Sequence, residues 1–281
     1  DFETLKKAFN QFLDNIPFYG FAVLCIDHPE VQNLIAEVKD RRIISYGTSP
    51  QADMRASNIS SNSEGQFFDL SLRKPADDET LEMKQMFLPM HGKHNLRNAL
   101  AAIAVAEELG MPLEAIKEAL AEFAGVKRRF TLTGEVDGVR VIDDYGHHPV
   151  EIAATLSSAR QATKATGGKV IAVVQPHRYS RVQSLFEDFC TCFNDADTVL
   201  VADIYEAGES PIDGIDRHSL TAGIASAGHR DVHGLPSPDL LAERVAAIAE
   251  KGDFVVCMGA GSVTNWAQAL PEQLAALKVK A

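Results

Sequence analysis

The stretch VRVIDDYGHHP at residues 139–149 decides the fold class of this 281-residue chain. It starts with apolar, β-branched residues, ends the apolar run with two aspartates, and reaches Pro149, where a helical pattern begins. A buried strand that leads directly into a helix is typical of a parallel α/β sheet. We therefore expect a parallel sheet in this half of the chain.

The same strand–helix alternation continues from residue 130 to the end of the chain. We expect strands at residues 139–144, 170–174, 199–203 and 254–258, and helices at residues 149–165, 182–193, 217–227, 240–250 and 262–270. This regular alternation predicts a doubly wound, mostly parallel, Rossmann-like domain.

The preceding half of the chain is organised differently. It contains a helical pattern at 3–14, a strand at 20–27, a helix at 29–38 and a strand at 42–46, which together indicate another α/β sheet. Residues 53–90 are polar and alternating, so we expect a small antiparallel sheet there, followed by helices at 94–109 and 112–123. We expect a hinge at 127–129, with domains at residues 1–128 and 129–281.

Composition excludes several classes of protein. With a net charge of -12 and a sequence pI of about 5.2, the chain is a poor partner for nucleic acid or anionic membranes. We find no membrane-spanning run and no signal peptide, and the four cysteines form no CxxC pair. Buried thiols in a cytoplasmic protein are the expectation. The chain also lacks an initiator Met and opens within an amphipathic helix, so we expect a piece of a longer protein.

Polar side chains gather where the predicted parallel strands end, which is where ligands bind in open α/β sheets. The segments concerned are residues 143–149, 175–181, 203–209 and 259–262. Asp143 and Asp144 could accept hydrogen bonds from ribose or hold a metal, or they could simply cap the next turn. The glycines Gly259 and Gly261 are weak evidence for a nucleotide site, because no phosphate-loop motif occurs in the chain.

Basic and amide side chains offer further candidates. Arg178 and Arg181 could each bind a carboxylate or phosphate in a bidentate manner, or form surface ion pairs with Glu187 or Asp188. The neighbours His147 and His148 face opposite ways on an extended segment, so we expect one to point into a pocket and one to support it. No further ligand lies at metal-like spacing from them.

A second set of candidates precedes the predicted domain boundary. Asn95 and Asn98 lie on one face of a helix, where they could bind adenine or cap the helix. Arg129 follows a glycine-containing break and could reach phosphate oxygens or form an interdomain salt bridge.

Four motifs together resemble the Mur ligase family. They are His94-Asn95-x-x-Asn98-Ala99, Arg128-Arg129-Phe130, DDYGHHP at 143–149 and QPHRYSR at 175–181, and the resemblance covers essentially the whole chain. It implies the remainder of a central ATP-binding α/β domain, followed by a C-terminal ligase domain. The UDP-sugar domain, the phosphate loop and the metal ligands of the family would lie outside these residues, so we expect the chain alone to be inactive.

The resemblance also implies an activity and roles for particular residues. It implies a ligase that uses ATP and Mg²⁺ to join L-alanine to UDP-N-acetylmuramate through an acyl phosphate, in peptidoglycan precursor synthesis. By motif position, Asn95, Asn98, Arg129 and Asp144 would bind ATP, whereas Tyr145, His147, Arg178 and Arg181 would bind the amino acid. Arg129 and His147 would be catalytic, and no metal ligand is expected in this chain.

Two alternatives remain open from the sequence. One is a related ligase of the family that recycles murein peptides. The other is a non-catalytic module that binds a nucleotide or a peptidoglycan precursor, if the native protein is this short.

Overall fold

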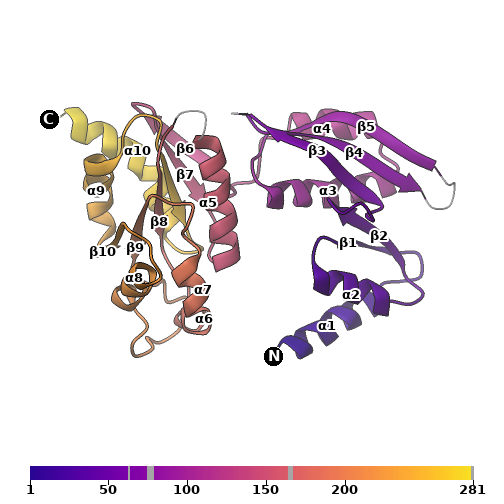
Figure 1. Ribbon diagram of the computed structural model, residues 1–281, viewed down its shortest axis with the longest axis horizontal. Helices are drawn as coiled ribbons and strands as arrows, with labels where there is room; N and C mark the ends of the chain where they lie inside the picture. The colour runs from indigo at the N-terminus through magenta and orange to yellow at the C-terminus, as the bar shows by residue number, and fades with distance from the viewer. Residues whose placement is uncertain (63, 75–78, 164–166, 280–281) are drawn as a thin grey trace. The chain divides into compact units, whose positions relative to one another are not determined.

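The computed structural model describes residues 1–62, 64–74, 79–163 and 167–279 (Figure 1). The chain divides into two compact units, Asp1–Ala124 and Gly125–Ala281. The sequence-based boundary after Arg128 lies four residues further along the chain. Each unit has its own sheet and its own hydrophobic core.

The first unit contains a five-stranded sheet of order β1-β2-β3-β4-β5. β1 (Phe21–Cys25) and β2 (Arg42–Gly47) are parallel, and α2 (Pro29–Glu37) connects them. β3 (Met54–Ser61), β4 (Gln66–Lys74) and β5 (Glu79–Leu88) pair in antiparallel fashion, as expected. They extend the sheet of β1 and β2, because Tyr46 of β2 pairs in parallel with Met54 of β3.

Two helices cover this sheet after β5. α3 (Lys93–Glu108) and α4 (Leu113–Ala121) match the helices predicted at 94–109 and 112–123 to within two residues. Leu96, Leu100 and Ile103 of α3 are buried in one cluster with Phe68 and Met86 of the strands. In contrast, α1 (Phe2–Asp14) buries only its Leu13.

The second unit contains a six-stranded sheet of order β10-β9-β8-β11-β7-β6. All neighbours are parallel except β6 and β7. The strands are β6 (Thr131–Val136), β7 (Val139–Asp144), β8 (Val170–Val174), β9 (Thr198–Ala202), β10 (Val232–Leu235) and β11 (Phe254–Met258). The doubly wound, mostly parallel sheet predicted from the sequence is therefore confirmed, with β6 and β10 as additional edge strands.

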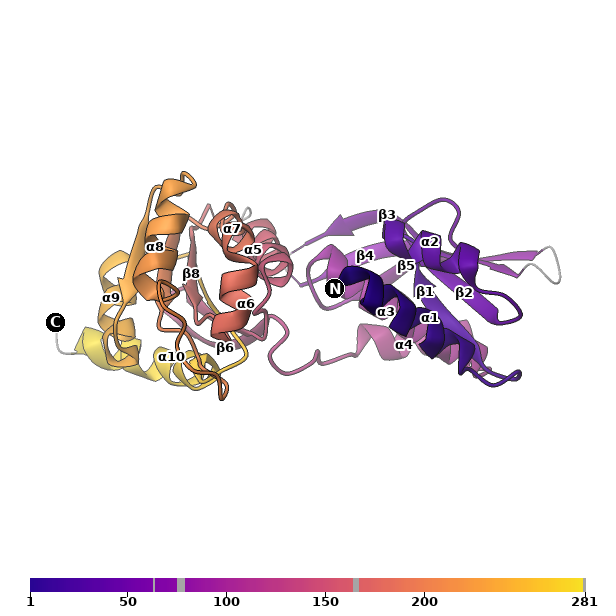
Figure 2. The same ribbon diagram turned by 90° about the horizontal axis from the view of Figure 1, so that it is seen from below.

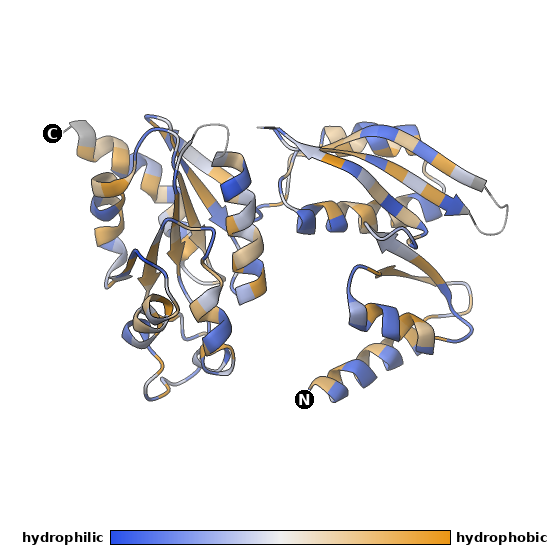
Figure 3. Ribbon diagram, in the orientation of Figure 1, coloured by the Kyte–Doolittle hydropathy of each residue, from blue (hydrophilic) through white to orange (hydrophobic). Residues whose placement is uncertain are grey.

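Helices cover both faces of this sheet (Figures 1 and 2). One core cluster joins the strands to α5 (Pro149–Thr163), α6 (Tyr179–Ser184), α7 (Phe186–Thr191) and α8 (Arg217–Ser226). The opposite cluster joins them to α9 (Leu241–Ile248), which follows the short helix η1 (Pro238–Leu240), and to α10 (Val263–Val279). The central strands β8, β9 and β11 are buried along their whole length, and Figure 3 colours them as hydrophobic.

Two predicted helices differ from the observed ones. The helix expected at 182–193 is divided into α6 and α7, because Leu185 between them has φ −121° and ψ 25°. The helix expected at 262–270 continues as α10 through Pro271, and Leu274 beyond the proline is buried in the core. The last two residues of the helix predicted at 149–165 lie outside the described residues. No helix within the described ranges is long and apolar enough to cross a membrane.

Candidate functional site

Hydrogen bonds between the loops tie together the carboxyl edge of the second sheet. The Gln175 N–H donates to the Met258 carbonyl at 2.9 Å, and the Gly259 N–H donates to the Asp144 carbonyl at 3.2 Å. The Tyr205 N–H donates to the Pro176 carbonyl at 2.8 Å. The ends of β7, β8, β9 and β11 are thus linked, and the loops that the sequence singled out lie at one edge of the sheet.

The Asp144 carboxylate is buried and already has partners. Its Oδ2 accepts from the Phe130 N–H at 2.8 Å, and its Oδ1 accepts from the Gly146 N–H at 2.8 Å and from Thr155 Oγ1 at 3.0 Å. These contacts fix the start of β6 and the turn after β7. The three bonds use three of the roughly four acceptor positions of a carboxylate, and the side chain is buried, so a ribose contact from Asp144 would compete with them.

Asp143 lies on the other face of β7. Thr264 Oγ1 donates to its Oδ2 at 2.6 Å, and Nε of Arg128 lies 3.9 Å from the same oxygen. Asp143 Oδ1 is buried and has no hydrogen-bond partner among the described residues. Burial raises the pKa of Asp143. Asp143 is only 2% exposed and lies beside the Arg128 guanidinium group, so it is poorly suited to hold a metal ion.

The two adjacent histidines serve different elements. His148 Nδ1 accepts from the Val150 N–H at 3.3 Å and so caps the start of α5. His147 Nδ1 lies 2.9 Å from the Tyr145 carbonyl oxygen, a contact in which Nδ1 is the donor. Glu151 accepts from both backbone N–H groups. Burial alone would raise the Glu151 pKa, but these bonds together with the nearby His147 and Arg129 side chains outweigh burial and lower it.

His177 is the centre of a cluster that the sequence interpretation did not single out. Its ring centroid lies 5.7 Å from that of His147 and 5.4 Å from that of Tyr205. Arg181 Nη1 lies 3.3 Å from His177 Nδ1 and donates to the His177 carbonyl at 3.2 Å. Burial and the nearby Arg181, His147 and Arg178 side chains lower the His177 pKa, so the ring is neutral at pH 7.

Arg178 precedes α6 with an unusual backbone conformation. Its φ of +71° lies in the region that favours glycine, and such strain typically costs about 1–3 kcal/mol. The Arg178 N–H donates to the Tyr205 carbonyl at 2.9 Å, which holds this conformation. The guanidinium group is half exposed and lies 3.5 Å from Glu209, which also accepts from Ser180 Oγ at 2.6 Å.

The arginines before β6 lie in different surroundings. Arg128 stacks over the Tyr145 ring at 4.6 Å and donates to the Gly259 carbonyl at 2.6 Å. Arg129 is half-buried, and its positive charge helps to lower the Glu151 pKa. Arg128 is therefore fixed within the site, although the sequence interpretation chose Arg129.

In the first unit, the two candidate asparagines differ in exposure. Asn95 is 4% exposed, and its Nδ2 donates to the His91 carbonyl at 2.8 Å. Asn98 is exposed. Asn95 thus has a partner in the segment that precedes α3, whereas the Asn98 side chain is accessible to a ligand.

The two glycines after β11 pack against neighbouring loops. A Cβ at Gly261 would lie 2.6 Å from Gln175 Oε1 and 2.6 Å from Cγ of Tyr205, and one at Gly259 would lie 2.6 Å from the Gln175 carbonyl oxygen. Close approach therefore explains these glycines without a nucleotide. In the described ranges, no group of three or more His, Cys, Asp or Glu residues is placed to hold a metal ion.

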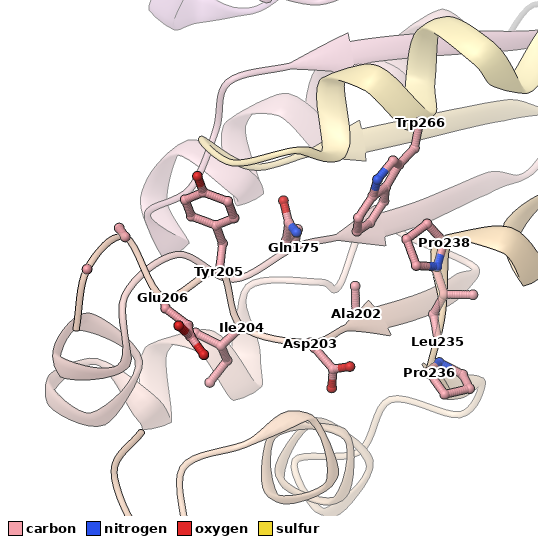
Figure 4. A pocket seen from close by; sticks show the side chains of 12 residues that line it. Gln175, Ala202, Asp203, Ile204, Tyr205, Glu206, Leu235, Pro236, Pro238 and Trp266 are labelled. Carbon is pink, nitrogen blue, oxygen red and sulfur yellow. The ribbon is translucent and has the colours of Figure 1, made fainter. Parts of the chain in front are cut away.

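A pocket of about 610 Å³ opens beside the His177 cluster (Figure 4). Tyr205 belongs to both features, because it stacks on His177 and also lines the pocket. The lining residues come from the ends of β8, β9 and β10 and from α10: Gln175, Ala202, Asp203, Ile204, Tyr205, Glu206, Ala207, Gly208, Leu235, Pro236, Pro238 and Trp266.

Family models match most of the chain. Residues 1–106 match the Mur ligase middle domain, and residues 128–261 match the Mur ligase, glutamate ligase domain.

Curated relatives are similar over almost the whole chain. A UDP-N-acetylmuramate–L-alanine ligase from Methylorubrum populi is 60% identical over 277 residues, which is 99% of this chain and 58% of the relative. The ligase of the same name from Nitrobacter hamburgensis is 56% identical over 276 residues, again 58% of its length. The chain thus spans less than two thirds of the length of these relatives.

Solved structures share the fold. A UDP-N-acetylmuramate–alanine ligase from Thermotoga maritima matches with a TM-score of 0.74 and 23% identity, over 99% of this chain and 56% of that chain. A murein peptide ligase from Psychrobacter arcticus matches with a TM-score of 0.67 and 24% identity, over 97% of this chain and 55% of that chain.

Proposed function

The chain belongs to the Mur ligase family, and from this premise we propose that it forms part of an ATP-dependent ligase that joins L-alanine to UDP-N-acetylmuramate. The similarity at 60% identity to a relative of that name favours this activity over recycling of murein peptides. The product would enter peptidoglycan precursor synthesis.

The amino-acid site carries this proposal. Arg178 and Arg181 flank the neutral ring of His177, and a guanidinium group recognises a carboxylate through paired N–H donors. We assign the carboxylate of L-alanine to these two arginines. Tyr145 and His147 form the adjoining wall, with ring centroids 5.2 Å apart.

His147 is suited to accept a proton in this site. Because its Nδ1 donates to the Tyr145 carbonyl, its Nε2 carries the lone pair. The ammonium group of L-alanine must lose a proton before the amine can attack. We propose that Nε2 of His147 takes that proton, directly or through one water.

The chemistry on the sugar follows from the family mechanism. ATP would transfer its γ-phosphoryl group to the lactyl carboxylate of UDP-N-acetylmuramate, which releases ADP and gives an acyl phosphate. The amine of L-alanine then attacks the carbonyl carbon, and the tetrahedral intermediate expels phosphate to leave an amide. The protein's part is mainly to position the reactants and to neutralise negative charge.

For ATP we propose contacts from Asn95, Asn98, Arg129 and Asp144. The exposure of Asn98 and the half-buried Arg129 support these assignments most directly. Asn95 and Asp144 are buried and already have internal hydrogen bonds, so they are less accessible to a ligand. Mg²⁺ would supply charge neutralisation at the phosphates, but Asp143 and Asp144 do not fit a metal site, so its ligands would come from elsewhere in the enzyme.

A chimeric enzyme tests the proposal. This chain would replace the matching part of the Methylorubrum populi relative, and phosphate release would be measured with ATP, UDP-N-acetylmuramate and L-alanine. We expect release that depends on all three substrates. A chimera that is folded but releases no phosphate with L-alanine would refute the proposed function. The chain by itself should release none.

A further inference from the structure

Glu209 joins the loop after β9 to the start of α6. Its Oε1 accepts from Ser180 Oγ at 2.6 Å, and its Oε2 accepts from the Ser180 N–H at 3.0 Å. Oε1 also lies 3.5 Å from Nη1 of Arg178. One carboxylate therefore contacts both the arginine that we assign to the substrate carboxylate and the first turn of the helix that follows this arginine.

A tight turn directs Glu209 toward α6. The Glu209 N–H donates to the Glu206 carbonyl at 3.0 Å, and the two residues between them have positive φ, +51° at Ala207 and +84° at Gly208. Two consecutive residues with positive φ are typical of a type I′ turn. Such a conformation persists at Ala207 only because surrounding contacts, those of Glu209 among them, hold it.

The backbone and the side chain of Arg178 are held by different contacts. The Arg178 N–H donates to the Tyr205 carbonyl at 2.9 Å, which fixes the backbone at its φ of +71°. Among the described residues, Glu209 is the one that contacts the guanidinium group, and it does so at Nη1 alone. The edge formed by Nε and Nη2 can therefore still bind a carboxylate in bidentate fashion.

We propose that Glu209 is a positioning residue, which holds the Arg178 guanidinium group in the orientation that binds the carboxylate of the amino acid. The proposal rests on the proposed function, because it gives Arg178 that ligand. Without Glu209, the long Arg178 side chain would sample several rotamers, and each substrate molecule would have to order it. The effect should therefore be on the affinity for the amino acid rather than on the chemical step.

Steady-state kinetics of the chimera test this role. Glu209→Ala should raise the KM for L-alanine by about tenfold, which corresponds to 1.4 kcal/mol of coupling within a hydrogen-bond network. The kcat and the KM for ATP should change little, because the contacts of Glu209 are with Ser180 and Arg178, neither of which is assigned to ATP. Asp213→Ala removes an exposed carboxylate of the same loop and should leave all three constants unchanged.

A double-mutant cycle shows whether Glu209 acts through Arg178. In the Arg178→Ala background, Glu209→Ala should raise the KM for L-alanine no further, whereas a general loosening of the loop would add to the first effect. Glu209→Gln keeps an acceptor for the Ser180 N–H but has no charge for Arg178, so its KM should be intermediate. This variant carries the test if Glu209→Ala does not fold. A lower KM in Glu209→Ala would show that Glu209 competes with the substrate for Arg178, and would overturn the proposal.

NMR relaxation of the chain itself needs no substrate and distinguishes this proposal from the proposed function. The Nε–H group of Arg178 should have a lower order parameter in Glu209→Ala than in the unchanged chain, and Asp213→Ala should have no such effect. A chimera that is inactive with L-alanine would refute the proposed function, and this measurement would still decide whether Glu209 orients Arg178. An order parameter that is the same with and without Glu209 would overturn the proposal, as would an unchanged KM for L-alanine in an active chimera.

Discussion

Thr155 on α5 donates a buried hydrogen bond of 3.0 Å to Asp144 at the end of β7. Both residues are only 3% exposed. The contact joins the first helix of the second unit to the strand that precedes it. It also gives Asp144 a structural role that competes with the role in ribose binding inferred from its motif.

Substitutions at these two positions separate the roles. Thr155→Val removes one of the hydrogen bonds that the buried Asp144 carboxylate accepts. This loss should lower the free energy of unfolding by about 1–3 kcal/mol. The KM for ATP of the chimera should stay unchanged, because Thr155 is not assigned to ATP. Asp144→Asn should both destabilise the second unit and raise the KM for ATP. If Asp144→Asn destabilises the protein and leaves the KM for ATP unchanged, Asp144 is structural only.

The two asparagines of α3 form a matched pair. Asn95→Ala removes a buried amide that donates to the His91 carbonyl, so we expect a loss of about 0.5–1.5 kcal/mol of stability in urea unfolding. Asn98→Ala changes an exposed side chain and should be within about 0.5 kcal/mol of the unchanged protein. The KM for ATP should rise for Asn98→Ala. Equal stabilities of the two variants would contradict the structural role of Asn95. An unchanged KM for ATP in Asn98→Ala would contradict the assignment of Asn98 to ATP.

The neutral His177 makes stability depend on pH. The His177 pKa is lowered in the folded state, so the unfolded chain binds the proton more readily. The stabilisation that the neutral ring contributes is therefore fully present only above the unfolded pKa of about 6.5. Stability should therefore fall as the pH drops from about 7 through the folded pKa. The groups that face the ring are Arg178, Arg181 and His147, which favour the neutral form, and Glu209, which opposes them.

Thermal melts of the chain between pH 7.5 and pH 5.5 measure this effect. His177→Asn should reduce the decrease in Tm over this range. His218→Asn, at an exposed histidine of α8, is the control and should follow the unchanged chain. An identical pH dependence of all three proteins would show that His177 is not the responsible group.

The central strands were predictable because burial on both faces leaves an unmistakable sequence pattern. The Val170–Val174 and Phe254–Met258 strands are uninterrupted apolar runs, and the predicted bounds are the observed ones. The edge strands β6 and β10 contain fewer apolar residues, and each contains a glycine, so the hydrophobic pattern did not predict them. The Asp137-Gly138 turn was the available signal for β6.

The position of the site was also predictable, but its partners were not. Parallel strands place their carboxyl ends at one edge of the sheet. That rule alone predicted that residues 143–149 and 175–181 lie close together. No spacing rule connects His177 to Tyr205, or Glu209 to Ser180, because these contacts join loops that are about 30 residues apart. For Asp144, the bond from the Gly146 N–H is the turn cap that the sequence left open, whereas its contacts with Phe130 and Thr155 are visible only in the structure. The contact of Asn95 with the His91 carbonyl is local, but it is not a helix cap.

The assignment of the two arginines after β8 gives the last prediction. A charge-assisted, bidentate contact with a carboxylate contributes on the order of 1.5–3 kcal/mol. Replacing Arg178 or Arg181 with alanine in the chimera should therefore raise the KM for L-alanine by roughly 10- to 150-fold, since 1.4 kcal/mol corresponds to tenfold. The KM for ATP should change little. Lysine in place of Arg178 should restore the affinity only in part, because a point charge cannot reproduce the planar guanidinium.

Arg160→Ala is a suitable control for these variants. Arg160 on α5 also pairs with a carboxylate, that of Asp197, at 2.6 Å. Asp197 also accepts from the Val170 N–H at the start of β8, so this pair lies at the opposite end of β8 from Arg178. Its loss should affect stability and leave both KM values unchanged. Steady-state kinetics with each substrate varied in turn distinguishes the outcomes. If Arg178→Ala weakens ATP binding and leaves the KM for L-alanine unchanged, the carboxylate does not bind at this pair of arginines, and the amino acid must enter elsewhere along the carboxyl edge of the sheet.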